Sequence, residues 1–130
     1  MICPDGCQCY HVLTWTKNII QCSDGGFKEL PQVLPMDASD IFLDGNSFTI
    51  LKSHIFIGRK NLKVLHLNNS NIEQIENQTF NGLKSLQILH LQNDDIDTIH
   101  GTEFNGLLKL RELYLQNNKI KYVNSSSFQS

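Results

Sequence analysis

The sequence predicts an α/β solenoid, in which successive coils share one core and short parallel strands line a concave face. Two observations predict it. Ala38, Leu62, Leu86 and Leu110 lie in matching surroundings at a constant interval of 24 residues, and a fixed period of this length is typical of stacked supersecondary units. All four cysteines precede this period, within the first 22 residues. We therefore expect a cysteine-rich N-terminal cap over residues 1–37 and four repeats over residues 38–130, the last one incomplete.

Each repeat carries apolar residues at fixed positions, counted from these anchors. The columns at positions 4, 6, 11 and 14 are Ile41, Leu65, Leu89 and Leu113; Leu43, Leu67, Leu91 and Leu115; Phe48, Ile72, Ile96 and Ile120; Leu51, Ile75, Ile99 and Val123. Side chains two residues apart point to the same face of a strand, so positions 4 and 6 predict one short strand per coil, stacked in parallel. The pattern LxxLxLxxNxLxxL is that of a leucine-rich repeat horseshoe.

Further columns predict the turns and the convex side. Position 9 holds a short polar residue in every repeat, a set that we call the turn ladder: Asn46, Ser70, Asp94 and Asn118. Such side chains hydrogen-bond the turning backbone of their own and the neighbouring coil. Position 19 holds Phe56, Phe80, Phe104 and Phe128, and position 21 holds Gly58, Gly82 and Gly106. We expect the phenylalanines to fill the convex side, where the return segment is irregular or briefly helical.

The cysteine cluster stands where a solenoid needs a cap, because the apolar end of the stack must be closed. Cys3, Cys7 and Cys9 form CxxxCxC, and Cys22 follows after twelve residues. Four cysteines allow three disulfide pairings, and the spacing does not choose among them. A structural zinc site is the alternative, although CxC fits poorly with the usual pairs of CxxC type. Two disulfides would require an oxidising compartment.

Positions 2, 3, 5, 7 and 8 of each repeat are expected to face outward on the concave side, and we look for binding there. Position 5 carries four rings, which we call the ring ladder: Phe42, His66, His90 and Tyr114. Aromatic side chains are favoured in protein interfaces, and imidazoles make recognition sensitive to pH. Stacked rings also stabilise neighbouring strands, so packing alone is the second interpretation. The columns beside the ladder are polar: Asp44, Asn68, Gln92 and Gln116, with Lys63, Gln87 and Arg111.

Composition and motifs exclude several classes of function. The formal net charge of −2 and the isoelectric point near 6.2 give no footprint for nucleic acid. No apolar stretch approaches the ~20 residues of a membrane span. The sequence has no GxSxG, HExxH or nucleotide-binding glycine loop, and two histidines without a carboxylate column are a poor metal site. We therefore expect no enzyme activity, no cofactor, no metal and no membrane contact, and protein partners instead.

Three Asn-x-Ser/Thr sequons agree with a secretory route, because each can accept a glycan there. They begin at Asn68, Asn77 and Asn124. Asn77 lies beyond the strand on the return side, where a glycan would face solvent, whereas Asn68 lies at the strand edge. We expect an extracellular protein, with Asn77 as the best of the three glycosylation sites.

Several stretches go beyond the general repeat pattern: CYH and TW in the cap, then LPMDAS, FLDGNSF, FIGRKNL, NNSNI and LRELYLQNNKI. Together they resemble the ectodomain of arthropod Toll-type receptors, at the cap and repeats that begin its second, membrane-proximal half. The cap resembles the N-terminal flank of extracellular leucine-rich repeat proteins, which implies disulfides Cys3–Cys9 and Cys7–Cys22. The resemblance also implies a single-pass receptor that senses a cystine-knot cytokine or a cell-surface protein, dimerises and brings cytoplasmic TIR domains together.

One departure concerns the end of the sequence. The last repeat stops at Ser130, and no second cysteine cluster follows. We expect no C-terminal cap and, from the open apolar end, self-association of the chain. A free-standing secreted recognition or adhesion module is the alternative to a receptor segment. In a third interpretation this block only spaces and aligns receptor chains, since cytokine binding in Toll-type receptors is attributed mainly to earlier repeats.

Overall fold

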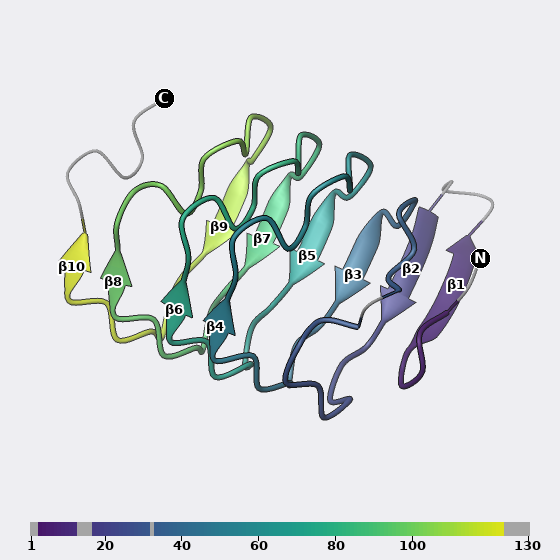
Figure 1. The fold of residues 1–130 in the computed structure, drawn as a ribbon, viewed down its shortest axis with the longest axis horizontal. Helices are drawn as coiled ribbons and strands as arrows, with labels where there is room; N and C mark the ends of the chain where they lie inside the picture. The colour runs from purple at the N-terminus through teal and green to yellow at the C-terminus, as the bar shows by residue number, and fades with distance from the viewer. Residues whose placement is uncertain (1–2, 13–16, 32, 124–130) are drawn as a thin grey trace.

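The computed structural model describes residues 3–12, 17–31 and 33–123, which wind into a solenoid of successive coils (Figure 1). One face carries a six-stranded sheet in the order β1-β2-β3-β5-β7-β9. Its members are β1 (Gln8–Val12), β2 (Lys17–Gln21), β3 (Asp40–Phe42), β5 (Val64–His66), β7 (Ile88–His90) and β9 (Glu112–Tyr114). All neighbours from β2 onward pair in parallel. The predicted solenoid of short parallel strands with an N-terminal disulfide pair is confirmed.

The strand register follows the 24-residue period. Ile41 pairs with Leu65, Leu65 with Leu89 and Leu89 with Leu113. Ile41, Leu65 and Leu89 are fully buried. The leucines and isoleucines of positions 4, 6, 11 and 14 form one continuous core through the coils. Burying such side chains contributes about 1.5–3 kcal/mol each, which makes this stack the main source of stability.

Where the structure describes them, the return segments are irregular, the first of the two forms that the sequence left open, and not briefly helical. Among the described residues they consist of turns and two-residue strands: β4 (Ile50–Leu51), β6 (Gln74–Ile75), β8 (Thr98–Ile99) and β10 (Tyr122–Val123). β4 pairs in parallel with β6, and β8 with β10. The physical reason lies in the backbone of the first two coils. His54 and Gln78 at position 17 adopt φ of 60° and 58°, and Gly58 and Gly82 at position 21 adopt 86° and 97°. Left-handed residues four positions apart interrupt any right-handed helix.

The convex phenylalanines pack as expected. The ring centroids of Phe56 and Phe80 lie 5.9 Å apart, as do those of Phe80 and Phe104, with interplanar angles of 10° and 7°. Phe56 and Phe80 are fully buried. Phe128 and the sequon residue Asn124 lie outside the described residues.

Turns after the concave strands depend on a column that the sequence interpretation placed on the outward face. Position 8 lies in the left-handed region in every coil, with φ of 76°, 54°, 59° and 59° for Gly45, Asn69, Asn93 and Asn117. Glycine and asparagine adopt this conformation most readily. Position 8 therefore forms the turn, and the turn ladder at position 9 follows it.

The cap contributes two strands that sequence reasoning did not predict. β1 runs antiparallel to β2, and β2 pairs in parallel with β3, so the cap extends the concave sheet. Ile20 and Cys22 occupy the core places of positions 4 and 6, and both are fully buried. The structure joins Cys3 to Cys9 and Cys7 to Cys22, the pairing that the resemblance implies. The division between cap and repeats at residue 37 stays a prediction.

Arg59 connects the cap to the first full coil. It stands at position 22, where the next two coils carry Leu83 and Leu107. One guanidinium nitrogen of Arg59 donates to the carbonyl oxygens of Leu34 and Pro35, at 2.9 and 3.2 Å. Partial burial lowers the pKa of this guanidinium from its usual value. The arginine thus replaces a core leucine at the junction where the repeat geometry changes.

Candidate protein-binding face

The ring ladder lies along the concave sheet, one ring per strand, on β3, β5, β7 and β9. Centroid distances are 4.1 Å from Phe42 to His66, 4.3 Å from His66 to His90 and 4.6 Å from His90 to Tyr114. The interplanar angles are 9°, 7° and 3°. The two imidazoles have both faces covered by neighbouring rings. They therefore offer ring edges and ring nitrogens, rather than ring faces, to anything that approaches the concave side.

The surroundings of the ladder set its protonation. Burial lowers the pKa of His66, and the neighbouring His90 lowers it further, while Asp44 and Asp40 act in the opposite direction. A depressed pKa keeps the His66 ring neutral at neutral pH, which avoids two positive charges in one stack. At the other end, the Tyr114 hydroxyl donates to a carboxylate oxygen of Glu112 at 2.9 Å. This hydrogen bond and the charge of Glu112 raise the pKa of the tyrosine.

Position 3, one of the positions that the sequence places on the outward face, forms a second column whose apolar residues sequence reasoning did not single out. The register places four residues beside the ladder, on the same face of the sheet: Asp40, Val64, Ile88 and Glu112. The available signal was their spacing, because residues two apart in a strand share a face, and position 3 therefore points the same way as the ring ladder at position 5. Val64 and Ile88 are partly buried, so an apolar strip accompanies the two histidines.

A groove of about 570 Å³ begins at this column and runs past the start of the strands, where Lys17, Asn61, Lys63 and Gln87 contribute to its lining. Asp40 is buried, and its Oδ2 lies 3.7 Å from the Lys17 ammonium nitrogen. Its Oδ1 has no hydrogen-bond partner among the described residues. The groove combines apolar and polar walls, as a protein interface does.

The polar column at position 7 borders the ladder on the other side. Asp44 accepts a hydrogen bond from the Ser23 hydroxyl at 2.6 Å, and the Gln92 amide nitrogen lies 3.3 Å from His90 Nδ1. Asn68 Oδ1 and Gln92 Oε1 are buried without a hydrogen-bond partner among the described residues. Lys63 and Arg111 at position 2 are exposed, and Gln87 is partly buried.

The turn ladder has a structural role at the end of the strands. Asn46 accepts two backbone N–H groups of the preceding coil and Asn118 accepts one, and the amide nitrogen of each donates to the position-6 carbonyls of its own and the preceding coil. Ser70 donates through its hydroxyl to the carbonyl of Leu43 at 3.2 Å. Asp94 accepts the N–H groups of Ser70 and Ile72 at 2.9 and 3.1 Å. These contacts bind adjacent coils together. Asn46, Ser70 and Asp94 are buried away from a partner, and Asn118 is partly buried.

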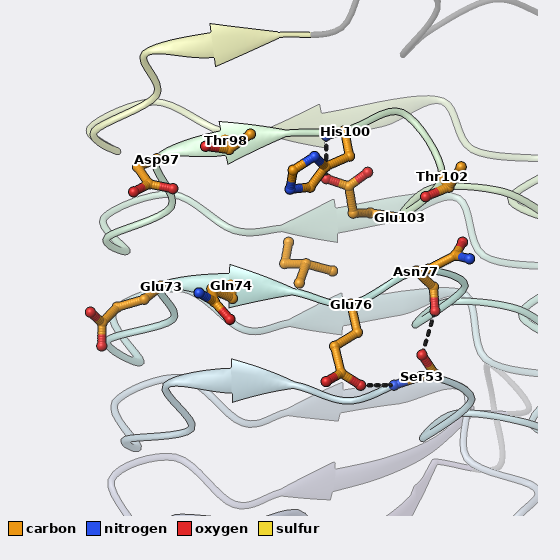
Figure 2. A pocket seen from close by; sticks show the side chains of 11 residues that line it. Ser53, Glu73, Gln74, Glu76, Asn77, Asp97, Thr98, His100, Thr102 and Glu103 are labelled. Atoms are coloured by element: carbon orange, nitrogen blue, oxygen red, sulfur yellow. Dashed lines mark hydrogen bonds between the residues drawn. The ribbon is translucent and has the colours of Figure 1, made fainter.

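A second groove of about 540 Å³ lies on the return side, beside β6 and β8 (Figure 2). Two of its carboxylates, those of Glu76 and Glu103, accept hydrogen bonds from the backbone. Glu76 accepts from the Ser53 N–H at 2.9 Å, and Glu103 accepts from the N–H groups of His100 and Gly101, both at 2.7 Å. The Ser53 hydroxyl donates to the carbonyl of Asn77 at 2.6 Å, which fixes the backbone of the sequon. The Asn77 residue itself is exposed.

Residues 3–12, 17–31 and 33–123 include no group of three or more His, Cys, Asp or Glu placed to hold a metal ion. Within the same ranges, no helix has the length and apolar character needed to cross a lipid bilayer.

Three known proteins are similar to parts of this chain. Toll-like receptor 7 of Drosophila melanogaster is 51% identical over 65 residues, which are 50% of this chain and 4% of that receptor. Leucine-rich repeat-containing protein 3B of Homo sapiens is 35% identical over 75 residues, 58% of this chain and 28% of that protein. Decorin of Bos taurus is 38% identical over 65 residues, 50% of this chain and 16% of decorin. The chain thus spans less than a third of each of these relatives.

Solved structures share the fold at low sequence identity. Human 5T4, the trophoblast glycoprotein, superposes with a TM-score of 0.78 over 92% of this chain and 42% of its own, at 23% identity. TLR13 in its complex with ssRNA13 superposes with a TM-score of 0.86 over 98% of this chain and 18% of its own, also at 23% identity. Residues 39–96 and 86–130 match the family model described as leucine rich repeat. With that match and the solenoid of stacked 24-residue coils, the chain belongs to the leucine-rich repeat family.

Proposed function

We propose that this chain is a non-catalytic, extracellular protein-binding segment of a Toll-type transmembrane receptor, and that it binds its partner through the concave face around the ring ladder. The observation that carries the proposal is the continuous stack from Phe42 to Tyr114 along four strands. The partner is a protein, either a cystine-knot cytokine or a cell-surface protein. Receptor self-association then accompanies signalling in innate immunity or development.

The physical case for the face is its composition. A stack of rings held by the sheet is rigid before binding, so little conformational entropy is lost when a partner orders it further. The apolar strip of Val64 and Ile88 lies beside the rings, and polar columns surround both. An apolar and aromatic centre within a polar rim is the usual anatomy of a protein interface.

The receptor assignment draws support from sequence. Half of the chain is 51% identical to part of Toll-like receptor 7 of Drosophila melanogaster, in line with the resemblance of FLDGNSF and FIGRKNL to arthropod Toll-type receptors. The two disulfides of the cap agree with an oxidising, extracellular location. We place the segment at the start of the membrane-proximal repeat block.

A free-standing secreted module is the alternative, favoured by the similarity to the proteoglycans decorin and biglycan, both 38% identical over half of the chain. Sequencing the native transcript beyond the codon for Ser130 separates the two. Further repeats, a cysteine cap, a span of ~20 apolar residues and a cytoplasmic domain support the receptor. A stop codon soon after Ser130 supports the secreted module.

Surface plasmon resonance tests the binding face. The immobilised chain is exposed in turn to purified cystine-knot cytokines and ectodomains from the same organism, and to a single-stranded RNA. Tyr114→Ala and His90→Ala are compared with Glu73→Ala and Lys52→Ala, two exposed residues on the return side. We expect the ladder variants to weaken the binding of a protein partner at least tenfold and the return-side variants to leave its affinity unchanged.

Two outcomes contradict the proposal. If the ladder variants leave partner binding unchanged, the concave face is not the interface, whether or not the return-side variants weaken binding. If only RNA binds, the partner class is wrong. Circular dichroism of each variant checks that the loss reflects the surface rather than unfolding.

A further inference from the structure

Three members of the turn ladder share one hydrogen-bonding task at the end of the strands. The Asn46 amide nitrogen donates to the carbonyl of Cys22 in the preceding coil at 3.0 Å, and to that of Leu43 in its own coil at 2.8 Å. The Asn118 amide nitrogen donates to Leu91 and Leu115, the equivalent carbonyls, both at 2.9 Å. Ser70 donates to Leu43 of the preceding coil. Each of these side chains thus supplies a donor to the carbonyl at position 6 of the coil before it.

Asp94 stands in the same place but lacks that donor when it is ionised. Its Oδ1 takes the acceptor role, because it receives the N–H groups of Ser70 and Ile72. Its Oδ2 is buried and has no hydrogen-bond partner among the described residues. In Asn46 and Asn118 the second terminal atom of the side chain, the amide nitrogen, faces two position-6 carbonyls, and for Asp94 the equivalent carbonyls are those of Leu67 and Leu91. Leu91 already receives Asn118, whereas Leu67 has no side-chain donor in the described part of the chain.

We propose that Asp94 is a proton-sensitive joint between the coils of β5 and β7, in which a protonated carboxyl group donates from Oδ2 to the Leu67 carbonyl and tightens the junction at mildly acidic pH. The reaction is a simple protonation of Oδ2 by solvent. It replaces a contact between two acceptors with one hydrogen bond, and it gives Asp94 the donor that asparagine supplies in the other coils.

The electrostatic setting favours this protonation. Burial raises the pKa of Asp94 to about 7, against the two backbone N–H hydrogen bonds that act to lower it, and the charge of Asp95 raises it slightly more. The ladder neighbours Ser70 and Asn118 carry no charge in either direction along the stack. Asp95 is itself paired with Lys119, whose ammonium nitrogen lies 3.1 Å from its carboxylate. Asp94 is 4% exposed, so solvent screens it little.

The sign of the pH dependence follows from linkage. The pKa of an aspartate in the unfolded chain is near its usual value of about 4, below that in the folded chain. Between these values the folded chain binds the extra proton, so stability falls as pH rises through about 7 and is fully regained as pH falls toward about 4. The joint is therefore tighter in an acidified vesicle than at the cell surface, next to the strands that carry His66 and His90.

Asp94→Asn tests the proposal, because asparagine supplies the missing donor at every pH. Denaturant unfolding is measured between pH 5 and pH 8 for the natural chain, for Asp94→Asn and for Asp95→Asn. Relative to Asp94→Asn, we expect the folded-to-unfolded ratio of the natural chain to drop by up to about tenfold for each pH unit above pH 5, levelling above pH 7. Asp95→Asn loses an exposed ion pair but should keep most of this slope.

A carbon-13 NMR titration of the aspartate carboxyl groups gives the second measurement, which does not depend on any variant. We expect the Asp94 signal to move between pH 6 and 8, together with the amide proton signals of Ser70 and Ile72. Equal pH profiles for the natural chain and Asp94→Asn, or an Asp94 carboxyl that titrates near pH 4, would overturn the proposal.

Discussion

The imidazole rings of His66 and His90 lie face to face on adjacent strands, with their centroids 4.3 Å apart and their planes 7° from parallel. At acidic pH this pair lowers the stability of the fold, because protonation of both rings would place two positive charges in one stack. Burial and the neighbouring ring both lower the pKa of His66. The folded chain therefore binds fewer protons at this site than the unfolded chain does just below pH 6.5, and the stability from the neutral ring is lost as pH falls.

Replacing His66 with phenylalanine, the residue that β3 carries in the same column, should keep the stack and remove the titration. We expect the free energy of unfolding to fall less between pH 7.5 and pH 5 in His66→Phe than in the natural chain, as measured by urea denaturation. His100→Gln, at an exposed site on the return side, is the control and should behave like the natural chain. An unchanged pH profile in His66→Phe would show that the stack tolerates the charge.

Asp94 and His66 change the stability of the chain in opposite directions as pH falls, so their contributions can be measured separately. Acidification stabilises the chain through Asp94 and destabilises it through His66, so the natural profile between pH 5 and 8 is the sum of two opposed slopes. Removing either group should reveal the other. The two groups lie on adjacent coils, His66 on that of β5 and Asp94 on that of β7.

Phe80 should be among the most costly residues to truncate. Its ring is fully buried and stacks between Phe56 and Phe104 on the convex side. Phe80→Ala leaves a cavity between the rings of the two neighbouring coils and should destabilise the chain by about 3–5 kcal/mol. Leu108→Ala, at a site that is 81% exposed, should change stability by less than about 0.5 kcal/mol. Thermal unfolding of both variants gives the comparison, and similar midpoints would contradict the role of the phenylalanine column.

The two disulfides should contribute unequally. Cys7 and Cys22 are 15 residues apart in sequence and Cys3 and Cys9 are 6 apart, so the former restricts the unfolded chain more. Cys22 is also fully buried against the core. Cys7→Ala with Cys22→Ala should cost about 3 kcal/mol or more, and Cys3→Ala with Cys9→Ala should cost less. Urea unfolding of the two double variants, under oxidising conditions, decides the order.

The fold could be predicted from sequence largely because every coil repeats the same pattern of buried positions. The leucines at positions 4 and 6 have a period of two, and the 24-residue interval leaves one way to stack them. The return segments could not be predicted so well, because nothing in their composition excludes a helix. The left-handed backbone at positions 17 and 21 does so, in His54 and Gln78 and in Gly58 and Gly82, and a histidine or a glutamine in a sequence does not by itself indicate that conformation.

The candidate site was predicted only in part, because only some of its residues form a column that stands out in the sequence. The ring ladder is visible as a column of aromatic residues. Val64 and Ile88 stand at position 3, which the sequence places on the outward face, but one valine and one isoleucine between two acidic residues do not by themselves indicate a binding strip. The cap strands escaped because their offset to the first coil is 21 residues rather than 24, as the pairing of Ile20 with Ile41 shows. The missing donor at Asp94 becomes apparent only when its hydrogen bonds are compared with those of Asn46 and Asn118.

Glycosylation should separate Asn77 from Asn68. Asn77 is exposed on the return side, whereas Asn68 lies on the concave face with its Oδ1 buried beside the ring ladder. For material secreted by cultured cells, we expect mass spectrometry of glycopeptides to find Asn77 occupied and Asn68 unmodified. A glycan on Asn68 would cover His66 and contradict the proposed binding face.

The timing of attachment at Asn77 follows from the same sequon. The Thr79 side chain is fully buried, and its hydroxyl donates to the carbonyls of Glu76 at 2.7 Å and Leu51 at 3.2 Å. An oligosaccharide transferase reads the sequon through this hydroxyl, so the folded chain hides the group that the enzyme needs. Purified folded chain should therefore resist modification in vitro, and reduced, unfolded chain should accept it. Equal modification of both forms would mean that the coil around β6 opens readily, which amide hydrogen exchange at Glu76 and Thr79 would then detect.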